Sequence, residues 1–302
     1  MKSIVEKTSK KAFTIVELLT VMSIIVILIG LLVPALNMVR RYAYEVKQQA
    51  QFHSIDAAIE LFNSEFDGYP DSSALDPMGE SYCGAMKLAE AMMGQDLMGF
   101  HPDSVFYSNG TDGTKMLYPD ATQVPADEYR NNLSTRKGPY LPLENANAYL
   151  LADVYGADNT APFAAGHFVL CDVYRRVTHK TTGKKIGMPI LYYKANTSRT
   201  RHDVTNPDDP ENIYNYRDNQ ELVLLGKPWD PPAAGGTPHR LAIEGSTPPG
   251  TRFYMNTRNE KVTTASRPYK ADTFILISAG YDGEYGTPDD ICNFDWKYQE
   301  LP

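Results

Sequence analysis

The sequence predicts an α+β protein in which one long N-terminal helix packs on a small antiparallel sheet that carries long loop insertions. Three observations support this prediction. Residues 13–36 are apolar at all but six positions, residues 37–66 place apolar side chains at helical spacing, and β-rich runs follow at 168–177, 186–194 and 274–278. We therefore divide the 302-residue chain into four parts: residues 1–12, 13–36, 37–66 and a globular head at 67–302.

The apolar run 13–36 is long enough to cross a membrane. As a helix its 24 residues would extend about 36 Å, and a hydrocarbon core is about 30 Å thick. Four lysines precede it (Lys2, Lys7, Lys10 and Lys11), and Glu6 is the only acid there. Because positive charge before a first span stays in the cytoplasm, we expect a single pass with the head outside the cytoplasm.

Glu17 is the unusual residue of this run. A carboxylate in a membrane-length segment costs roughly 2.5–3.5 kcal/mol at the helix centre and less near the end, so it needs a partner. A secretory signal does not fit, because its apolar core is shorter, about 7–15 residues, and ends in a small-residue cleavage site. An uncleaved N-terminal anchor needs only length and lysines, and it remains an alternative.

The stretch Lys10-Lys11-Ala12-Phe13-Thr14-Ile15-Val16-Glu17 resembles the processing signal of type IV pilins and of type II secretion pseudopilins. The resemblance implies cleavage between Ala12 and Phe13 by a prepilin peptidase, followed by N-methylation of Phe13. Family members usually carry Gly where this chain has Ala12. The resemblance also implies that Glu17 pairs with the N-terminal amine of a neighbouring subunit during assembly, and that Pro34 bends or loosens the helix.

Three further stretches resemble the major pseudopilin: Asp67-Gly68-Tyr69-Pro70, Gly138-Pro139-Tyr140-Leu141-Pro142 and Gly226-Lys227-Pro228-Trp229-Asp230-Pro231. The resemblance implies a pilin-like fold and a structural, non-enzymatic role in a secretion or pilus-like filament. Its implied partners are the prepilin peptidase, other pseudopilin subunits and an assembly platform in the inner membrane, with the head in the periplasm. Major subunits are usually about half as long, so residues 71–137 and 143–225 are expected insertions.

Beyond the apolar run, the helix is expected to continue to about Glu65 and to stop at Asp67-Gly68. Its apolar residues form two stripes. One stripe is Val39, Ala43, Val46, Ala50, Ala57 and Leu61, and the other is Phe52, Ile55, Ile59, Phe62 and Phe66.

In the head we expect a short helix at 85–93 and a hairpin of 168–177 with 186–194, turning at 178–183. Residues 274–278 are expected to form a core strand. The polar, proline-rich segments 200–219 and 228–250 are expected to be surface excursions.

The segment Ser278–Ile291 resembles the calcium-binding loop of major pseudopilins. Calcium prefers six to eight oxygen ligands, which carboxylates and the carbonyls of a glycine-rich loop supply. The expected ligands are Asp282, Asp289 and Asp290, with Thr287 and the carbonyl of Tyr285. The spacing is not that of an EF-hand, and Asp-Gly and Pro-Asp-Asp are also ordinary turn formers.

Composition limits the other functions. The net charge is −8, and because residues 1–12 contribute +3, the chain after cleavage carries −11, which argues against a nucleic-acid surface. Cys83, Cys171 and Cys292 allow at most one internal disulfide and leave one thiol over. No hydrolase, P-loop or metalloprotease motif is present. The alternative from another class is a membrane-anchored periplasmic binding module that uses this N-terminus only for targeting.

Overall fold

The computed structural model describes residues 14–242, 248–263 and 265–298. Ala12 and Phe13, the predicted cleavage and methylation residues, lie outside these ranges. The chain divides into two compact units, one ending at Tyr44 and the other running from Glu45 to the C-terminus, and each is described by itself.

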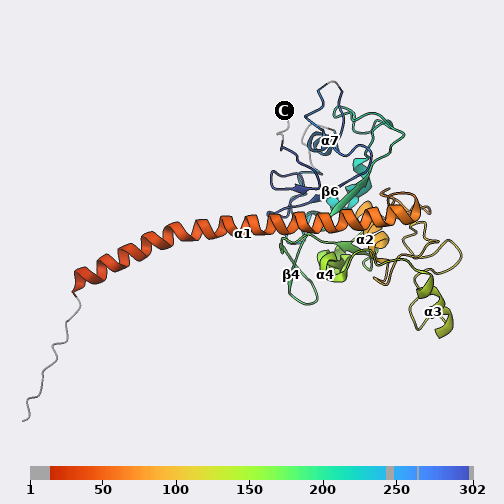
Figure 1. Cartoon of the computed structure of the whole chain (residues 1–302), viewed down its shortest axis with the longest axis horizontal. Coiled ribbons are helices and arrows are strands. Elements are labelled where there is room, and N and C mark those ends of the chain that lie inside the picture. Colours follow the sequence, from red (N-terminus) through yellow and green to blue (C-terminus); the bar gives the residue numbers. More distant parts are fainter. Residues whose placement is uncertain (1–13, 243–247, 264, 299–302) are drawn as a thin grey trace, which may run out of the picture. The chain divides into compact units, whose positions relative to one another are not determined.

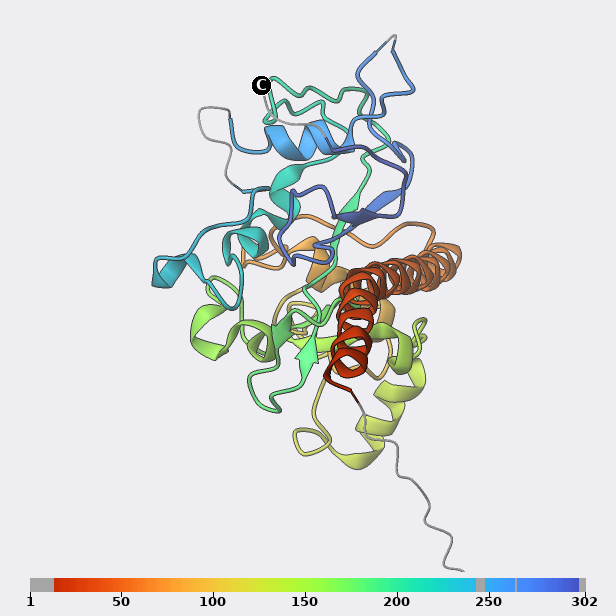
Figure 2. The same cartoon turned by 90° about the vertical axis from the view of Figure 1, so that its left-hand side faces the viewer.

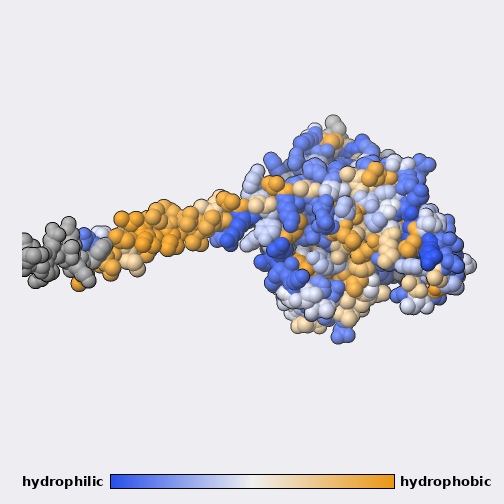
Figure 3. Space-filling model, turned by 60° about the horizontal axis from the view of Figure 1, so that its bottom comes forward, coloured by the Kyte–Doolittle hydropathy of each residue, from blue (hydrophilic) through white to orange (hydrophobic). Residues whose placement is uncertain are grey.

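The first unit holds most of α1, a helix that spans Ile15–Phe66 in all. From Ile15 to Leu36 its large apolar side chains are all exposed, and Figure 3 shows them along one side of the helix. The hydroxyls of Thr20 and Ser23 donate to the Glu17 and Leu19 carbonyls, at 3.0 and 2.8 Å, so these two polar groups are satisfied within the helix. Among the described residues, α1 is the one helix long and apolar enough to cross a membrane.

The α1 helix is unbroken at Pro34. Proline has no N–H, so the carbonyl of Gly30, four residues earlier, lacks its helical donor there. Downstream, the helix ends where predicted, one residue beyond Glu65. The left-handed residue that ends it is Asp67 (φ 52°) rather than Gly68.

The second unit is α+β and is built mainly of turns and loops around short strands (Figure 2). Strands β5 (Leu191–Lys194), β6 (Phe274–Ser278) and β7 (Ile291–Cys292) form an antiparallel sheet in that order, with Leu191 opposite Ile277. Strands β1 (Ala148–Leu150) and β2 (Phe168–Leu170) pair antiparallel. A bridge between Cys171 and Pro189 connects β2 to the segment that leads into β5.

The predicted hairpin is confirmed in shape but is interrupted. Strands β3 (Val177–Thr178) and β4 (Lys185–Ile186) form its tip, and β2 and β5 lie at its base. Pro189 cannot donate to a ladder, and Arg175 adopts a left-handed conformation (φ 41°), so regular pairing breaks between tip and base. The predicted strand 274–278 is confirmed as β6, which is buried throughout.

Helix α2 (Gly84–Met93) confirms the helix expected at 85–93, and all ten of its residues are buried. One core contains the second predicted stripe of α1 together with α2 and the sheet (Figures 1 and 2). It includes Phe52, Ile55, Ile59 and Phe62 of α1, Leu88 and Met92 of α2, and Tyr192, Phe274 and Leu276 of the sheet. The first predicted stripe stays on the surface, with Val46 and Leu61 more than half exposed.

A second core lies around β5, the hairpin and the C-terminal segments. The remaining helices of the second unit are short: α3 (Ala126–Thr135), α4 (Leu143–Ala146), α5 (Leu151–Tyr155), α6 (Gln220–Leu224), α7 (Thr251–Thr257), and 3₁₀ turns at Ala157–Asn159, Tyr216–Asn219 and Pro232–Ala234. The three cysteines are buried as free thiols.

The prediction that 200–219 is a surface excursion is wrong for its C-terminal half. Tyr214 and Asn219 are fully buried. The Asn219 side chain accepts the Ala85 N–H at 2.8 Å and donates to the Tyr192 carbonyl at 2.7 Å, so it joins the start of α2 to β5. Some polar side chains of this segment, such as Asn219, satisfy backbone groups inside the head, whereas others, such as Arg217 and Glu211, face water.

Candidate functional site

The first candidate site is the start of α1, where Glu17 has a local partner. The Glu17 carboxylate accepts the Thr14 N–H at 3.0 Å and the Thr14 hydroxyl at 2.9 Å, and the Glu17 N–H donates back to the Thr14 hydroxyl at 3.2 Å. The Thr14 carbonyl accepts the N–H of Leu18, the first helical bond. This reciprocal arrangement is a capping box, with Thr14 as N-cap and Glu17 three residues later.

The capping box supplies, within one chain, a partner of the kind that Glu17 was expected to need, so a plain anchor could also use this residue. The Thr-x-x-Glu spacing was visible in the sequence and is a known helix-start pattern. Glu17 therefore has a structural use within one chain, and its proposed role between chains must be tested against that use.

The second candidate site is the acidic loop between β6 and β7. Asp282, Thr287 and Asp289 are in direct contact there: the Asp282 N–H donates to Asp289 at 2.8 Å, and the Thr287 hydroxyl donates to Asp289 at 2.9 Å. Burial, together with the nearby Asp289 carboxylate, raises the pKa of Asp282 to about 6. Two carboxylates this close favour a shared proton or a bound cation.

The other two predicted ligands lie beside this contact. Asp290 is buried, and one of its carboxylate oxygens accepts the Gly286 N–H at 2.7 Å. Its other oxygen, Oδ1, is buried and finds no hydrogen-bond donor in the described part of the chain. The Tyr285 carbonyl accepts the Leu241 N–H at 3.0 Å.

The donor set fits calcium in kind, because it offers carboxylate, hydroxyl and carbonyl oxygens and one buried oxygen without a donor. Its arrangement is looser than that of a closed metal cage. Within residues 14–242, 248–263 and 265–298, no three His, Cys, Asp or Glu side chains gather closely enough to hold a metal by themselves.

The acidic loop packs against residues 226–242. Glu284 is 3.3 Å from Lys227 and 3.7 Å from Arg240. Burial lowers the pKa of His239 to about 3, so its neutral ring accepts the Tyr285 N–H at 3.2 Å. The turn 226–231 and the loop 278–291, which both resemble pseudopilin elements, therefore form one structural unit.

The stretch 138–142, which also resembles a pseudopilin element, lies at the end of α1. The Tyr140 hydroxyl donates to Glu65, the Tyr140 N–H donates to the Met92 carbonyl at 2.8 Å, and the Tyr140 ring meets Phe62 edge to face at 5.9 Å. This stretch fixes the end of α1 onto α2.

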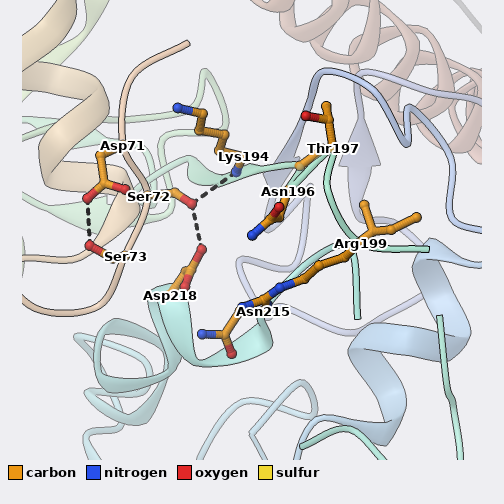
Figure 4. Close-up of a pocket in the computed structure, with 11 residues that line it drawn as sticks. Asp71, Ser72, Ser73, Lys194, Asn196, Thr197, Arg199, Asn215 and Asp218 are labelled. Carbon is orange, nitrogen blue, oxygen red and sulfur yellow. Dashed lines mark hydrogen bonds between the residues drawn. The ribbon is translucent and has the colours of Figure 1, made fainter. Parts of the chain in front are cut away.

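A polar cavity of about 420 Å³ lies in the head, outside the sites expected from the sequence. Asp71, Ser72 and Ser73 line it from the segment after α1, and Asn196, Thr197 and Arg199 line it from the segment after β5 (Figure 4). Asp218 is buried at its wall, accepts the Ser72 hydroxyl at 2.5 Å, and has its pKa raised to about 7 by burial. Its mixed donors and acceptors suit a polar ligand.

No protein-family model, curated protein or solved structure matches this chain.

Proposed function

We propose that this chain is a structural subunit of a type II secretion or type IV pilus-like filament, anchored in the inner membrane before assembly. The observation that carries the proposal is a helix start that combines an exposed apolar run of membrane length with one carboxylate, Glu17, after a basic N-terminal stretch that resembles a pilin leader. A filament supplies what this run lacks in the single chain, which is neighbouring helices to cover it. The head is then a pilin-like head, exposed to the periplasm.

In this account prepilin peptidase cleaves between Ala12 and Phe13, and the new amine of Phe13 becomes the partner of Glu17 in the next subunit. Pairing an ammonium with a carboxylate in a low-dielectric core removes two costly lone charges at once. The capping box leaves this possible, since a carboxylate has lone pairs for several donors and only one Glu17 oxygen is engaged by Thr14. Other pseudopilin subunits and an inner-membrane assembly platform complete the set of partners.

Two substitutions separate pairing between chains from capping within one chain. Glu17→Gln keeps the capping box, because Gln serves at this position as Glu does, but it removes the charge. Thr14→Ala keeps the charge and removes the cap. With the full chain expressed beside a prepilin peptidase and a pilus-type assembly system, we expect Glu17→Gln to lower filament yield at least about tenfold, the factor for 1.4 kcal/mol.

Thr14→Ala should assemble to within about threefold of wild type, since a lost cap costs only about 1 kcal/mol. Filaments are counted by electron microscopy of sheared fractions, with membrane levels of the subunit measured in parallel. Normal assembly of Glu17→Gln together with failure of Thr14→Ala would assign Glu17 to capping and remove the argument for pairing.

We also propose that the acidic loop holds Ca²⁺ through the Asp282 and Asp289 carboxylates, with Thr287, Asp290 and the Tyr285 carbonyl as further oxygen ligands. A bound cation would offset the repulsion of the clustered carboxylates and fix the loop against residues 226–242. At a calcium concentration 100 times the dissociation constant, the free energy of unfolding of the head should rise by about 2.7 kcal/mol. Thermal unfolding of the full chain in calcium and in chelator checks this. Asp289→Asn should abolish most of the difference, and equal unfolding temperatures for wild type would contradict the site.

The alternative function, a membrane-anchored periplasmic binding module, is favoured by one observation, the polar cavity beside Asp218. It predicts that Glu17→Gln leaves localisation and ligand binding intact, and it gives no reason for filaments to form. We propose no enzymatic activity for this chain.

A further inference from the structure

Four cations gather at one cavity of this acidic protein. Lys47 of α1, Arg175 between β2 and β3, Lys184 just before β4 and Lys185 at its start line a cavity of about 380 Å³. We name this cavity, together with the smaller one beside it, the cationic groove. A chain of net charge −8 that places four positive side chains together has a local charge opposite to its overall charge.

None of these four side chains has an ion-pair partner in the described residues, although ion pairs are formed elsewhere in the head, as in Arg136–Asp96 and Lys87–Asp71. Lys185 donates to the Thr178 hydroxyl at 2.7 Å, which is a neutral acceptor.

Two carboxylates line the groove, Asp172 in the first cavity and Glu144 in the second, and Asp172 is buried and already accepts three hydrogen bonds. Their donors are the Tyr174 and Met188 N–H groups and the Ser278 hydroxyl, at 2.9–3.1 Å. Among the described residues no ion pair joins Asp172 to these cations, so they remain available to an anion from outside the chain.

The second cavity, of about 270 Å³, shares Lys47, Asn147 and Val173 with the first and continues the groove along α1. Gln51 and Glu144 line it. The Gln51 amide group donates to the Cys171 carbonyl at 2.9 Å, which fixes its orientation, and its own carbonyl oxygen, Oε1, is buried without a donor among the described residues. An unpaired buried acceptor favours a ligand that brings its own hydroxyl donors.

The groove thus offers cations at one end and acceptors at the other. A phosphate group suits the first end, where Arg175 presents a planar fork and the lysines supply point charges. Hydroxyl groups of an alcohol that is esterified to that phosphate suit Gln51 and Glu144. A phosphoglycerol group carries both.

We propose that the cationic groove binds the phosphoglycerol headgroup of an anionic phospholipid. The source is the membrane rather than a soluble metabolite because Lys47 follows the last residue of the apolar run, Leu36, by eleven positions on the same helix. That tether keeps lipid headgroups at high local concentration. This inference rests on the membrane anchoring in the proposed function and adds a lipid preference to it.

Native mass spectrometry of the full chain in detergent tests the proposal. Phosphatidylglycerol and phosphatidylcholine with identical acyl chains are offered in equal amounts, so that a preference reports the headgroup alone. The groove variant is Arg175→Asn, Lys184→Gln and Lys185→Gln, with Asn chosen because it tolerates the left-handed conformation of residue 175. The control is Lys115→Gln, Lys261→Gln and Lys297→Gln, which removes equal charge from three exposed lysines outside the groove.

We expect wild type and control to retain phosphatidylglycerol at least about fivefold over phosphatidylcholine, and the groove variant to retain both equally, since each nearby cation contributes about fivefold to binding of an acidic headgroup. An unchanged preference in the groove variant would overturn the proposal. The proposal would also be overturned if glycerol 1-phosphate raised the unfolding temperature of wild type while wild type showed no preference for phosphatidylglycerol, because the ligand would then be a soluble molecule. Carbonate extraction of membranes reports anchoring separately, so loss of the anchor and loss of the groove give different results.

Discussion

At Gly280 strand β6 turns into the acidic loop, and here a single residue decides whether the loop can close. Its φ is 64°, and a Cβ at this position would lie 2.0 Å from the carbonyl oxygen of Asp289. The loop is rich in glycine, but the sequence does not show which glycine lies against another backbone segment.

We expect Gly280→Ala to lower the free energy of unfolding by about 2–4 kcal/mol, from the left-handed conformation and the clash together. Gly183→Ala is the matched control. Its φ is 68°, but nothing lies within 4 Å of the added carbon, so about 1 kcal/mol is expected. Urea unfolding of both variants measures the difference, and equal losses would show that Gly280 matters only for its φ.

Asp218 gives the head a pH dependence at the scale of one residue. Burial raises its pKa in the folded state to about 7 from an ordinary value of 3.8. The folded state therefore binds this proton more tightly, so the stabilisation is complete below about pH 4 and is lost as pH rises through 7.

We expect wild type to unfold at a lower urea concentration at pH 8 than at pH 5. Between these pH values this group lowers the free energy of unfolding by up to about 1.4 kcal/mol per pH unit. Asp218→Asn should flatten that slope while it keeps an acceptor for the Ser72 hydroxyl. Buried Asp172, with a pKa also raised to about 7 by burial, should leave a residual slope. A slope unchanged in Asp218→Asn would mean that Asp218 does not titrate in this range.

At the scale of elements, the sequence predicted α1, α2 and β6 well, because periodicity and apolar runs report local burial. It could not tell which apolar stripe of α1 faces the head. Both stripes have helical spacing, and the choice depends on the sheet and on α2, which come later in the chain. The side chains that place the distant segments, such as Asn219, leave no periodic signal at all.

Phe62 and its neighbour Leu61 test that choice. Phe62 packs edge to face against Phe100 at 5.1 Å and is 4% exposed, whereas Leu61 is 56% exposed. Phe62→Ala should lower the free energy of unfolding by about 3–5 kcal/mol and Leu61→Ala by no more than about 0.5 kcal/mol. Chemical unfolding of the full chain in detergent measures both. A comparable loss in Leu61→Ala would place the first stripe inside the folded head.

At the scale of the whole molecule, the candidate sites were predicted unevenly. The acidic residues 282, 289 and 290 could be chosen from the sequence because they cluster within one loop. The cationic groove could not, because Lys47, Arg175 and Lys184 are far apart in the chain and meet only when the hairpin packs on α1. The reciprocal bonds of Thr14 and Glu17 were within reach of the sequence, since the pattern is local.

If this chain is processed as a filament subunit, the mass of its N-terminus records the cleavage. The protein is purified from membranes of a host that carries a prepilin peptidase, and the mass of its N-terminal peptide is measured by mass spectrometry. The account predicts a chain that begins at N-methylated Phe13. A chain that still begins at Met1, in a host that processes its own pilins, would contradict the account and leave Ile15–Leu36 as a plain membrane anchor.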